Sequence, residues 1–209
     1  MMTLVRTSAA LVLLGVLNTS FAAANYCGDL KNHYGPLDYR IANGAGFPLV
    51  EDAHFTEQVQ NGLGGVTGPI GGDLDYTLRA IPNHPRALAT IGAVSIRTKT
   101  AQLQGARYPT ECYFERAVRF APDDPVARAA YGNYLAATGK TSNALSMLKA
   151  AVEMAPENAT INYNLGLVYM KLKDYDNAKI YADKAYSLGF PLPGLRNQLA
   201  EARKNGAQK

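Results

Sequence analysis

The feature that most constrains the fold of this chain is an internal repeat in its C-terminal half. When Pro125 is aligned with Ala159, side-chain sizes agree at many positions at once. The matching positions are Tyr131-Gly132 with Leu165-Gly166, Leu135 with Tyr169, Ala144 with Ala178, Leu148 with Ala182, and Ala151 with Ala185. Self-similarity at a fixed period of this length is typical of proteins built from stacked structural units. The repeat therefore predicts an array of such units.

Each unit has the pattern of two helices that pack on each other. Large side chains recur with a helical period, as Tyr131, Leu135 and Leu148 do in the first unit, and are expected to fill the space between helices. Gly132 and Ala144 are small, as positions of close helix approach require. Capping residues agree with this division into helices. They are Asp124 before Pro125, Gly139, Thr141 or Ser142, Asn158, Asp174 and Gly189.

These positions resemble the tetratricopeptide repeat. The family pattern has a large apolar residue followed by Gly on the first helix, small alanines around an aromatic or Leu on the second, and a closing Pro. Pro156 supplies the closing Pro of the first unit, and Pro191, slipped by one position, that of the second. Arg128 and Asn162 stand where the family typically has Trp. The resemblance implies an all-α solenoid of tetratricopeptide helix-turn-helix units.

The array is predicted to extend on both sides of the two regular units. An imperfect unit precedes them, in which Pro85 aligns with Pro125, a longer step than the one from Pro125 to Ala159. The excess falls in a polar turn from Thr98 to Pro109. We expect about three repeats plus a capping helix, in which Leu195 and Leu199 lie one turn apart. The predicted boundaries are a partial repeat helix at 73–84, repeats at 85–124, 125–158 and 159–192, and the capping helix and tail at 193–209.

Residues 25–72 lack the repeat and are rich in Gly, Pro and Tyr, so they are predicted to form an irregular N-terminal segment. The stretch Tyr26–Phe47 is too aromatic for a disordered tail, and we expect it to pack along the array. One short helix is predicted at His54–Gln60, where Phe55 and Val59 share a face.

A glycine-rich stretch, Gly62–Gly72, follows that short helix. A phosphate-binding loop would need a Gly-Lys-Ser/Thr sequence, which is absent, and Asp73 and Asp75 would repel a phosphate. A flexible connector is therefore predicted here.

The N-terminal stretch 1–24 has the pattern of a cleavable secretory signal. Arg6 precedes an apolar run from Ala9 to Leu17, and Ala22 and Ala24 place the cleavage before Asn25. A retained anchor would need about 20 apolar residues, more than this run supplies. We therefore expect a periplasmic or secreted protein with no membrane insertion after cleavage.

Export bears on the two cysteines, Cys27 and Cys112, which are predicted to form a disulfide because the compartment is oxidising. The three histidines, His33, His54 and His84, show no i,i+4 spacing, so neither a metal site nor a cofactor is expected. A capping or turn role is predicted for His84, which precedes Pro85 at a repeat start.

Charge and motif content argue against two classes of function. The formal net charge is +4, and the Lys and Arg residues are interleaved with Asp and Glu, so no nucleic-acid partner is expected. The histidines come with no nucleophile elbow, so no enzymatic activity is expected.

The resemblance implies that the first helices line a concave groove that binds a protein or peptide. Asn133 and Asn164 match the asparagines of a two-Lys, two-Asn carboxylate clamp found in some family members, but Ala129 stands where its first Lys would be. The candidate groove residues are the cations Arg86, Arg97 and Lys171, the amides Asn133 and Asn164, and the apolar Tyr163, Leu167 and Met170. They favour a partner of apolar and acidic character.

Two alternatives to a binding adaptor remain open. One is an accessory component of an envelope polymer or pilus assembly system that uses the same groove. The other is a ligand-binding or enzymatic protein built on residues 25–72, for which an ordered polar pocket around His33 or His54 would be the distinguishing observation.

Overall fold

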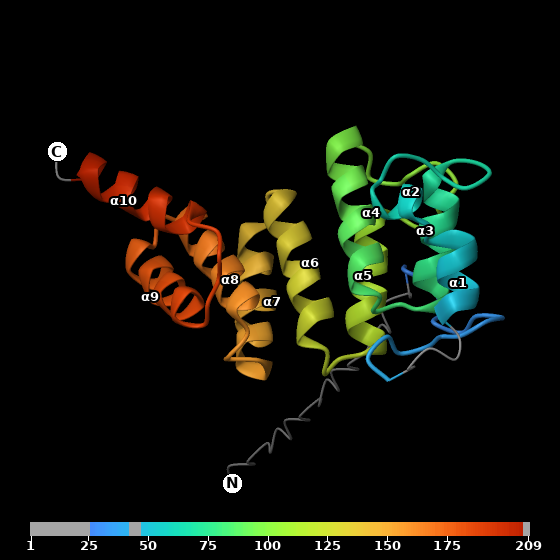
Figure 1. Ribbon diagram of the computed structural model, residues 1–209, viewed down its shortest axis with the longest axis horizontal. Helices are drawn as coiled ribbons and strands as arrows, with labels where there is room; N and C mark the ends of the chain where they lie inside the picture. The colour runs from blue at the N-terminus through green and yellow to red at the C-terminus, as the bar shows by residue number, and fades with distance from the viewer. Residues whose placement is uncertain (1–25, 42–46, 207–209) are drawn as a thin grey trace, which may run out of the picture.

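The computed structural model describes residues 26–41 and 47–206, so the predicted signal peptide and its cleavage site lie outside the described residues. Within these ranges the regular secondary structure consists of α-helices alone (Figure 1). The helices are α1 Phe47–His54, α2 Glu57–Gln60, α3 Ile70–Ala80, α4 Pro85–Thr98, α5 Thr110–Phe120, α6 Pro125–Ala137, α7 Thr141–Met154, α8 Ala159–Lys171, α9 Tyr175–Ser187 and α10 Gly194–Gly206. None of these helices has the length and apolar character needed to cross a membrane.

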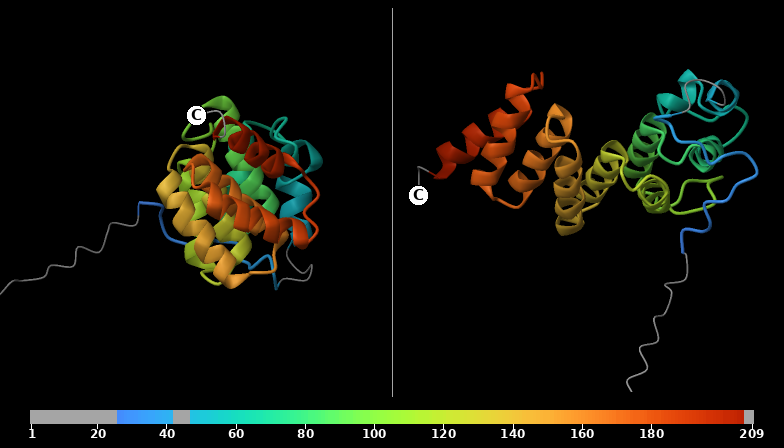
Figure 2. Two further views of the ribbon diagram at one scale, coloured as in Figure 1. Left: turned by 90° about the vertical axis from the view of Figure 1, so that its left-hand side faces the viewer. Right: turned by 90° about the horizontal axis from the view of Figure 1, so that it is seen from below.

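The helices form the predicted solenoid. Three pairs, α4–α5, α6–α7 and α8–α9, stack along the long axis, and α10 packs on α8 and α9 at the end of the array (Figures 1 and 2). The helices α6 and α8 begin at Pro125 and Ala159, the two residues that the repeat aligned. The polar turn of the imperfect unit separates α4 from α5. The all-α tetratricopeptide architecture is therefore confirmed.

Local capping fixes where these helices begin and end. The carboxylate of Asp124 accepts hydrogen bonds from the backbone N–H groups of Val126 and Ala127 at the start of α6. Asn158 and Asp174 cap α8 and α9 in the same way. Gly139, just after α6, has a φ of +86°, which favours glycine.

Glycines set the distance between packed helices. A Cβ atom on Gly132 would lie 2.7 Å from Leu148 Cγ, which confirms the predicted close approach of α6 and α7. A Cβ atom on Gly166 would lie 2.6 Å from Leu195 Cδ2 of α10 and 3.4 Å from Ala178 O of α9. Gly166 therefore spaces α8 from the capping helix as well as from its own pair helix.

The N-terminal segment differs from the prediction in its helices. The predicted helix His54–Gln60 spans the break between α1 and α2, and α1 was not predicted. The apolar side of α1 consists of Phe47 and Val50, which pack against the end of α3 at Ala80 and Ile81. This burial depends on residues distant in sequence, so the local pattern does not reveal it.

The glycine-rich stretch is packed and is not the free connector that was predicted. A Cβ atom on Gly71 would lie 2.3 Å from the carbonyl oxygen of Gln104, in the turn before α5. The backbone N–H of Val66 donates to the Asp73 carboxylate at 2.8 Å. The helix α3 begins at Ile70, within the stretch, so close packing accounts for glycine at position 71.

A disulfide fastens the start of the described chain to α5. Cys27 and Cys112 are bonded, with their Cα atoms 5.0 Å apart, which confirms the predicted pair. From there the segment runs past the end of α3, where the N–H of Leu37 donates to Ala80 O, and the N–H of Tyr39 donates to Asn83 Oδ1. Residues 26–41 thus contact α3, α5 and the loops at their ends.

Candidate functional site

Two adjoining cavities follow the first helices of the repeats. One, of about 300 Å³, lies mainly between α4 and α6, and the other, of about 270 Å³, lies between α6 and α8. Both are lined by Ala130 and Asn133, so they form one continuous surface, which we call the groove. The first cavity is lined by Leu88, Ala89, Gly92, Ala93, Ile96, Phe114, Ala130, Asn133 and Tyr134, and the second by Val126, Ala129, Ala130, Asn133, Asn158, Thr160, Ile161 and Asn164.

The groove combines small apolar side chains with amides. Asn158 uses its side-chain oxygen to cap α8, where it accepts from the N–H of Ile161. Within the described ranges, the side-chain amides of Asn133 and Asn164 have no hydrogen-bond partner. Each amide offers two donors and an acceptor to a ligand. The structure brings these two predicted residues together.

The three predicted cations are bound elsewhere in the molecule. The guanidinium of Arg97 donates to the carbonyl oxygen of Gly62, and Lys171 Nζ donates to Ala136 O at 2.7 Å. The guanidinium of Arg86 lies 5.7 Å from the centre of the Phe55 ring. None of the three lines either cavity of the groove.

The predicted apolar floor belongs mainly to the interior. Tyr163 is only 9% exposed, its ring stacks on Phe190 at 3.9 Å, and its hydroxyl accepts from the N–H of Leu195 at 3.2 Å. Leu167 and Met170 pack in the same cluster. The prediction that Tyr163 is an exposed contact for a partner is therefore wrong, because the residues after α9 fold back over it.

Phe114 is a groove residue that was missed because the prediction considered only the first helices. Phe114, from α5, stacks on Tyr134 at 4.7 Å and forms the base of the first cavity. Gly92 makes room for it, since a Cβ atom there would lie 3.1 Å from Phe114 Cζ. The aligned positions of Gly92 and Gly132 were the sequence signal for this close approach.

His84 has the predicted capping role. It is fully buried, and its Nδ1 accepts from the N–H of Ala87 at the start of α4. Its Nε2 lies 2.8 Å from Glu51 Oε1 and donates to it, because Nδ1 already acts as an acceptor. Burial lowers the pKa of His84, and the nearby Glu51 carboxylate opposes this shift.

The other two histidines have different surroundings. His54 stacks on Tyr76 at 4.0 Å and lies 3.0 Å from Asp73 Oδ1, while Asp73 Oδ2 holds Val66. This pair therefore fastens the glycine-rich stretch to α1 and α3. His33 is exposed. In the part of the chain that the structure describes, no group of three or more His, Cys, Asp or Glu could hold a metal ion.

Comparison with family models agrees with the helix pairs α6–α7 and α8–α9. A family model described as a tetratricopeptide repeat matches residues 130–190. A solved chain titled "MamA MSR-1 C2" is similar, with 14% sequence identity and a TM-score of 0.41. The similarity covers 57% of this chain and 65% of that chain, which is less than two thirds of its length. No curated protein matches the chain. The matched stretch runs from within α6 to just beyond α9 and so covers most of the two regular repeats.

Proposed function

We propose that this protein is an exported scaffold that binds an extended peptide segment of a partner protein in the groove. The observation that carries the proposal is the continuity of the two cavities along α4, α6 and α8 through Ala130 and Asn133. Residues 26–41 contact α3 and α5 instead, which leaves this surface accessible to a partner.

The chemistry of the groove favours main-chain recognition. A side-chain amide presents the same donor and acceptor as a peptide bond, so Asn133 and Asn164 suit an extended backbone. Ala89, Ala93 and Ala129 are small and let that backbone approach closely. Because Arg97 and Lys171 already donate to carbonyl oxygens, we expect charge to contribute less than these amides.

Export is part of the proposal. It is supported by the predicted signal at residues 1–24 and by the bonded pair Cys27–Cys112, since disulfides persist in oxidising compartments such as the periplasm.

The test begins with the protein from Asn25 onward, immobilised and exposed to an envelope extract. A captured partner is mapped to a binding peptide, and the affinity of that peptide is measured by calorimetry. The double substitution Asn133→Ala and Asn164→Ala removes both amides, and we expect about a 10-fold or greater loss of affinity. Asn143→Ala is the matched control, because Asn143 is exposed on α7 and outside the groove.

The outcomes separate the groove from other surfaces. If the double variant binds the peptide as well as the control does, and circular dichroism shows that both are folded, the groove is not the site. Ala93→Gln supplies a second test, because a larger side chain at this exposed position narrows the first cavity without touching either asparagine.

A further inference from the structure

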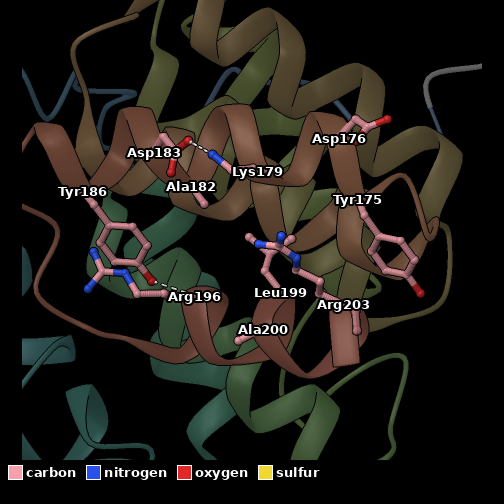
Figure 3. Close-up of a pocket in the computed structure, with 11 residues that line it drawn as sticks. Tyr175, Asp176, Lys179, Ala182, Asp183, Tyr186, Arg196, Leu199, Ala200 and Arg203 are labelled. Carbon is pink, nitrogen blue, oxygen red and sulfur yellow. Dashed lines mark hydrogen bonds and ion pairs between the residues drawn. The ribbon is translucent and has the colours of Figure 1, made fainter. Parts of the chain in front are cut away.

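The largest of the cavities described here lies away from the groove, between α9 and α10. Its volume is about 530 Å³. Figure 3 shows Tyr186 and Arg196 at one end, Tyr175 at the other, and Leu199 and Arg203 between them. Ala182 and Ala200 also line it, from α9 and α10 respectively.

The capping helix continues the repeat. Pro193 follows Ala159 at the same interval at which Ala159 follows Pro125, and in this register Leu199-Ala200 falls on Leu165-Gly166. The contacts agree, because α10 packs on α8 and α9 as α8 packs on α6 and α7. The helix α10 therefore occupies the place of the first helix of a further unit.

Among the described residues, no helix takes the place of the second helix of that unit. In the preceding unit, α9 covers α8 at Gly166, with Ala178 O and Ala182 N 3.4 and 3.5 Å from a Cβ atom placed there. In α10, the corresponding residue, Ala200, is exposed and lines the cavity. Ala200 is thus a small residue at the point where a second helix would cross α10. The cavity lies at this point.

More cations than carboxylates line the cavity, which favours an acidic occupant; the cations are Lys179, Arg196 and Arg203, and the carboxylates are Asp176 and Asp183. Lys179 is paired with Asp183, and the guanidinium of Arg196 lies 4.1 Å from the centre of the Tyr186 ring. Arg203 has no ion-pair partner among the residues that the structure describes. Arg196 and Arg203 lie about 10 Å apart along α10, with Leu199 between them.

We propose that the α9–α10 cavity is a second docking site, which receives an amphipathic helix of a partner protein. This helix packs on α10 as α9 packs on α8, with a small residue against Ala200 and carboxylates facing Arg203 and Arg196. A second copy of the chain is a poorer fit, because α3, the unpaired second helix at the other end, is covered by α1 and α2.

The probes are two labelled synthetic peptides. Both copy the face of α7 formed by Ala144, Leu148 and Ala151, and they differ only in flanking residues, which are Glu in the acidic peptide and Lys in the basic one. Dissociation constants for the protein from Asn25 onward are measured by fluorescence anisotropy. We expect the acidic peptide to bind about 10-fold or more tightly than the basic one.

Substitutions with matched controls locate the binding. Ala200→Leu should weaken the acidic peptide about 10-fold or more, whereas Gln198→Leu, on the same helix outside the cavity, should not. Arg203→Glu should abolish the preference for the acidic peptide, whereas Lys204→Glu should leave it. Asn133→Ala with Asn164→Ala should change neither affinity, which makes the result independent of the groove.

Three results of the peptide measurements contradict the proposal. They are the absence of acidic-peptide binding, equal affinities for the two peptides, and equal effects of Ala200→Leu and Gln198→Leu. Sedimentation velocity tests the other occupant. If the protein self-associates and Ala200→Leu abolishes the association, a second copy fills the cavity and the assignment to a partner helix is wrong.

Discussion

His84 Nε2 donates a hydrogen bond to Glu51 Oε1 at 2.8 Å and thereby joins α4, the first helix of the array, to α1. The imidazole also lies 4.6 Å from the Tyr39 ring and 4.7 Å from the Phe55 ring, centre to centre. One buried side chain therefore caps a repeat helix and holds three parts of the N-terminal segment against it. The segment is an integral part of the fold at this end of the solenoid.

This contact predicts a specific pH dependence of stability. Burial, with a smaller contribution from Arg86, lowers the pKa of His84 in the folded state, while Glu51 raises it less. The unfolded chain therefore binds a proton near pH 6.5 more readily than the folded chain does. The contribution of His84 to the free energy of unfolding should be fully present above pH 6.5. It should decrease as the pH drops below this value, by at most about 1.4 kcal/mol per pH unit.

Urea unfolding between pH 7.5 and pH 5 measures this slope. His84→Asn keeps a capping side chain and should reduce the slope, whereas His33→Asn, at an exposed position, should not. Equal slopes in the two variants would show that another group causes the acid sensitivity.

Tyr163→Ala should destabilise the C-terminal end of the solenoid. The substitution removes a ring stacked on Phe190 and the acceptor for the N–H of Leu195, at a cost of about 3–5 kcal/mol. Tyr163→Phe keeps the ring and should cost only about 1 kcal/mol. Thermal melts compare the two, and similar losses would mean that the hydroxyl, and not the ring, holds α10.

Gly166→Leu should be more damaging than a surface change on α10. The new side chain would meet Leu195 and the backbone of α9, so we expect a cost of about 1–3 kcal/mol or more from overpacking. Glu201→Ala is exposed and should cost less than about 0.5 kcal/mol. Equally mild effects in chemical denaturation would contradict the packing described for Gly166.

The disulfide and Arg116 are expected to stabilise the same contact. Arg116 is 1% exposed, and its Nη1 donates to Cys27 O at 3.0 Å and to Asp29 O at 2.7 Å. Replacing both cysteines by Ala should cost at most about 4–5 kcal/mol by the chain-entropy model, since the closed loop is long. Arg116→Ala should then cost less than in the bonded protein, because its carbonyl partners are no longer held in place.

A double-mutant cycle measures this coupling from urea unfolding. We expect an interaction energy of at least about 0.5 kcal/mol. Strict additivity would show that Arg116 and the disulfide act independently.

The sequence revealed the array because repeat packing depends on residues at fixed spacing. Gly132, Ala144 and Leu148 lie close together for reasons visible within a single repeat unit. The sequence revealed Asn133 and Asn164 for the same reason, since both lie on the groove side of the first helices. Long-range partners were not visible in this way, because Glu51 and His84 are 33 residues apart and nothing in the local pattern pairs them.

The same limit explains the misplaced binding residues. A helical pattern assigns Tyr163 and Arg97 to one face but says nothing about which other segment covers that face. Phe190, after α9, covers Tyr163, and Gly62, after α2, engages Arg97. Residues that line the groove and residues that contact a neighbouring segment therefore occur at the same helical spacing. The spacing alone does not distinguish the two kinds.

The last prediction separates these two kinds of residue. Arg97→Ala removes the donor to Gly62 O, and we expect a loss of stability of about 1 kcal/mol with no change in affinity for a groove-bound peptide. Asn133→Ala should show the opposite pattern, with weaker peptide binding and nearly unchanged stability, because its amide has no partner in the described chain. Calorimetry and urea unfolding on both variants give the comparison. If Arg97→Ala weakens the peptide as strongly as Asn133→Ala does, the cation takes part in recognition directly, and the groove extends past Ile96 to the end of α4.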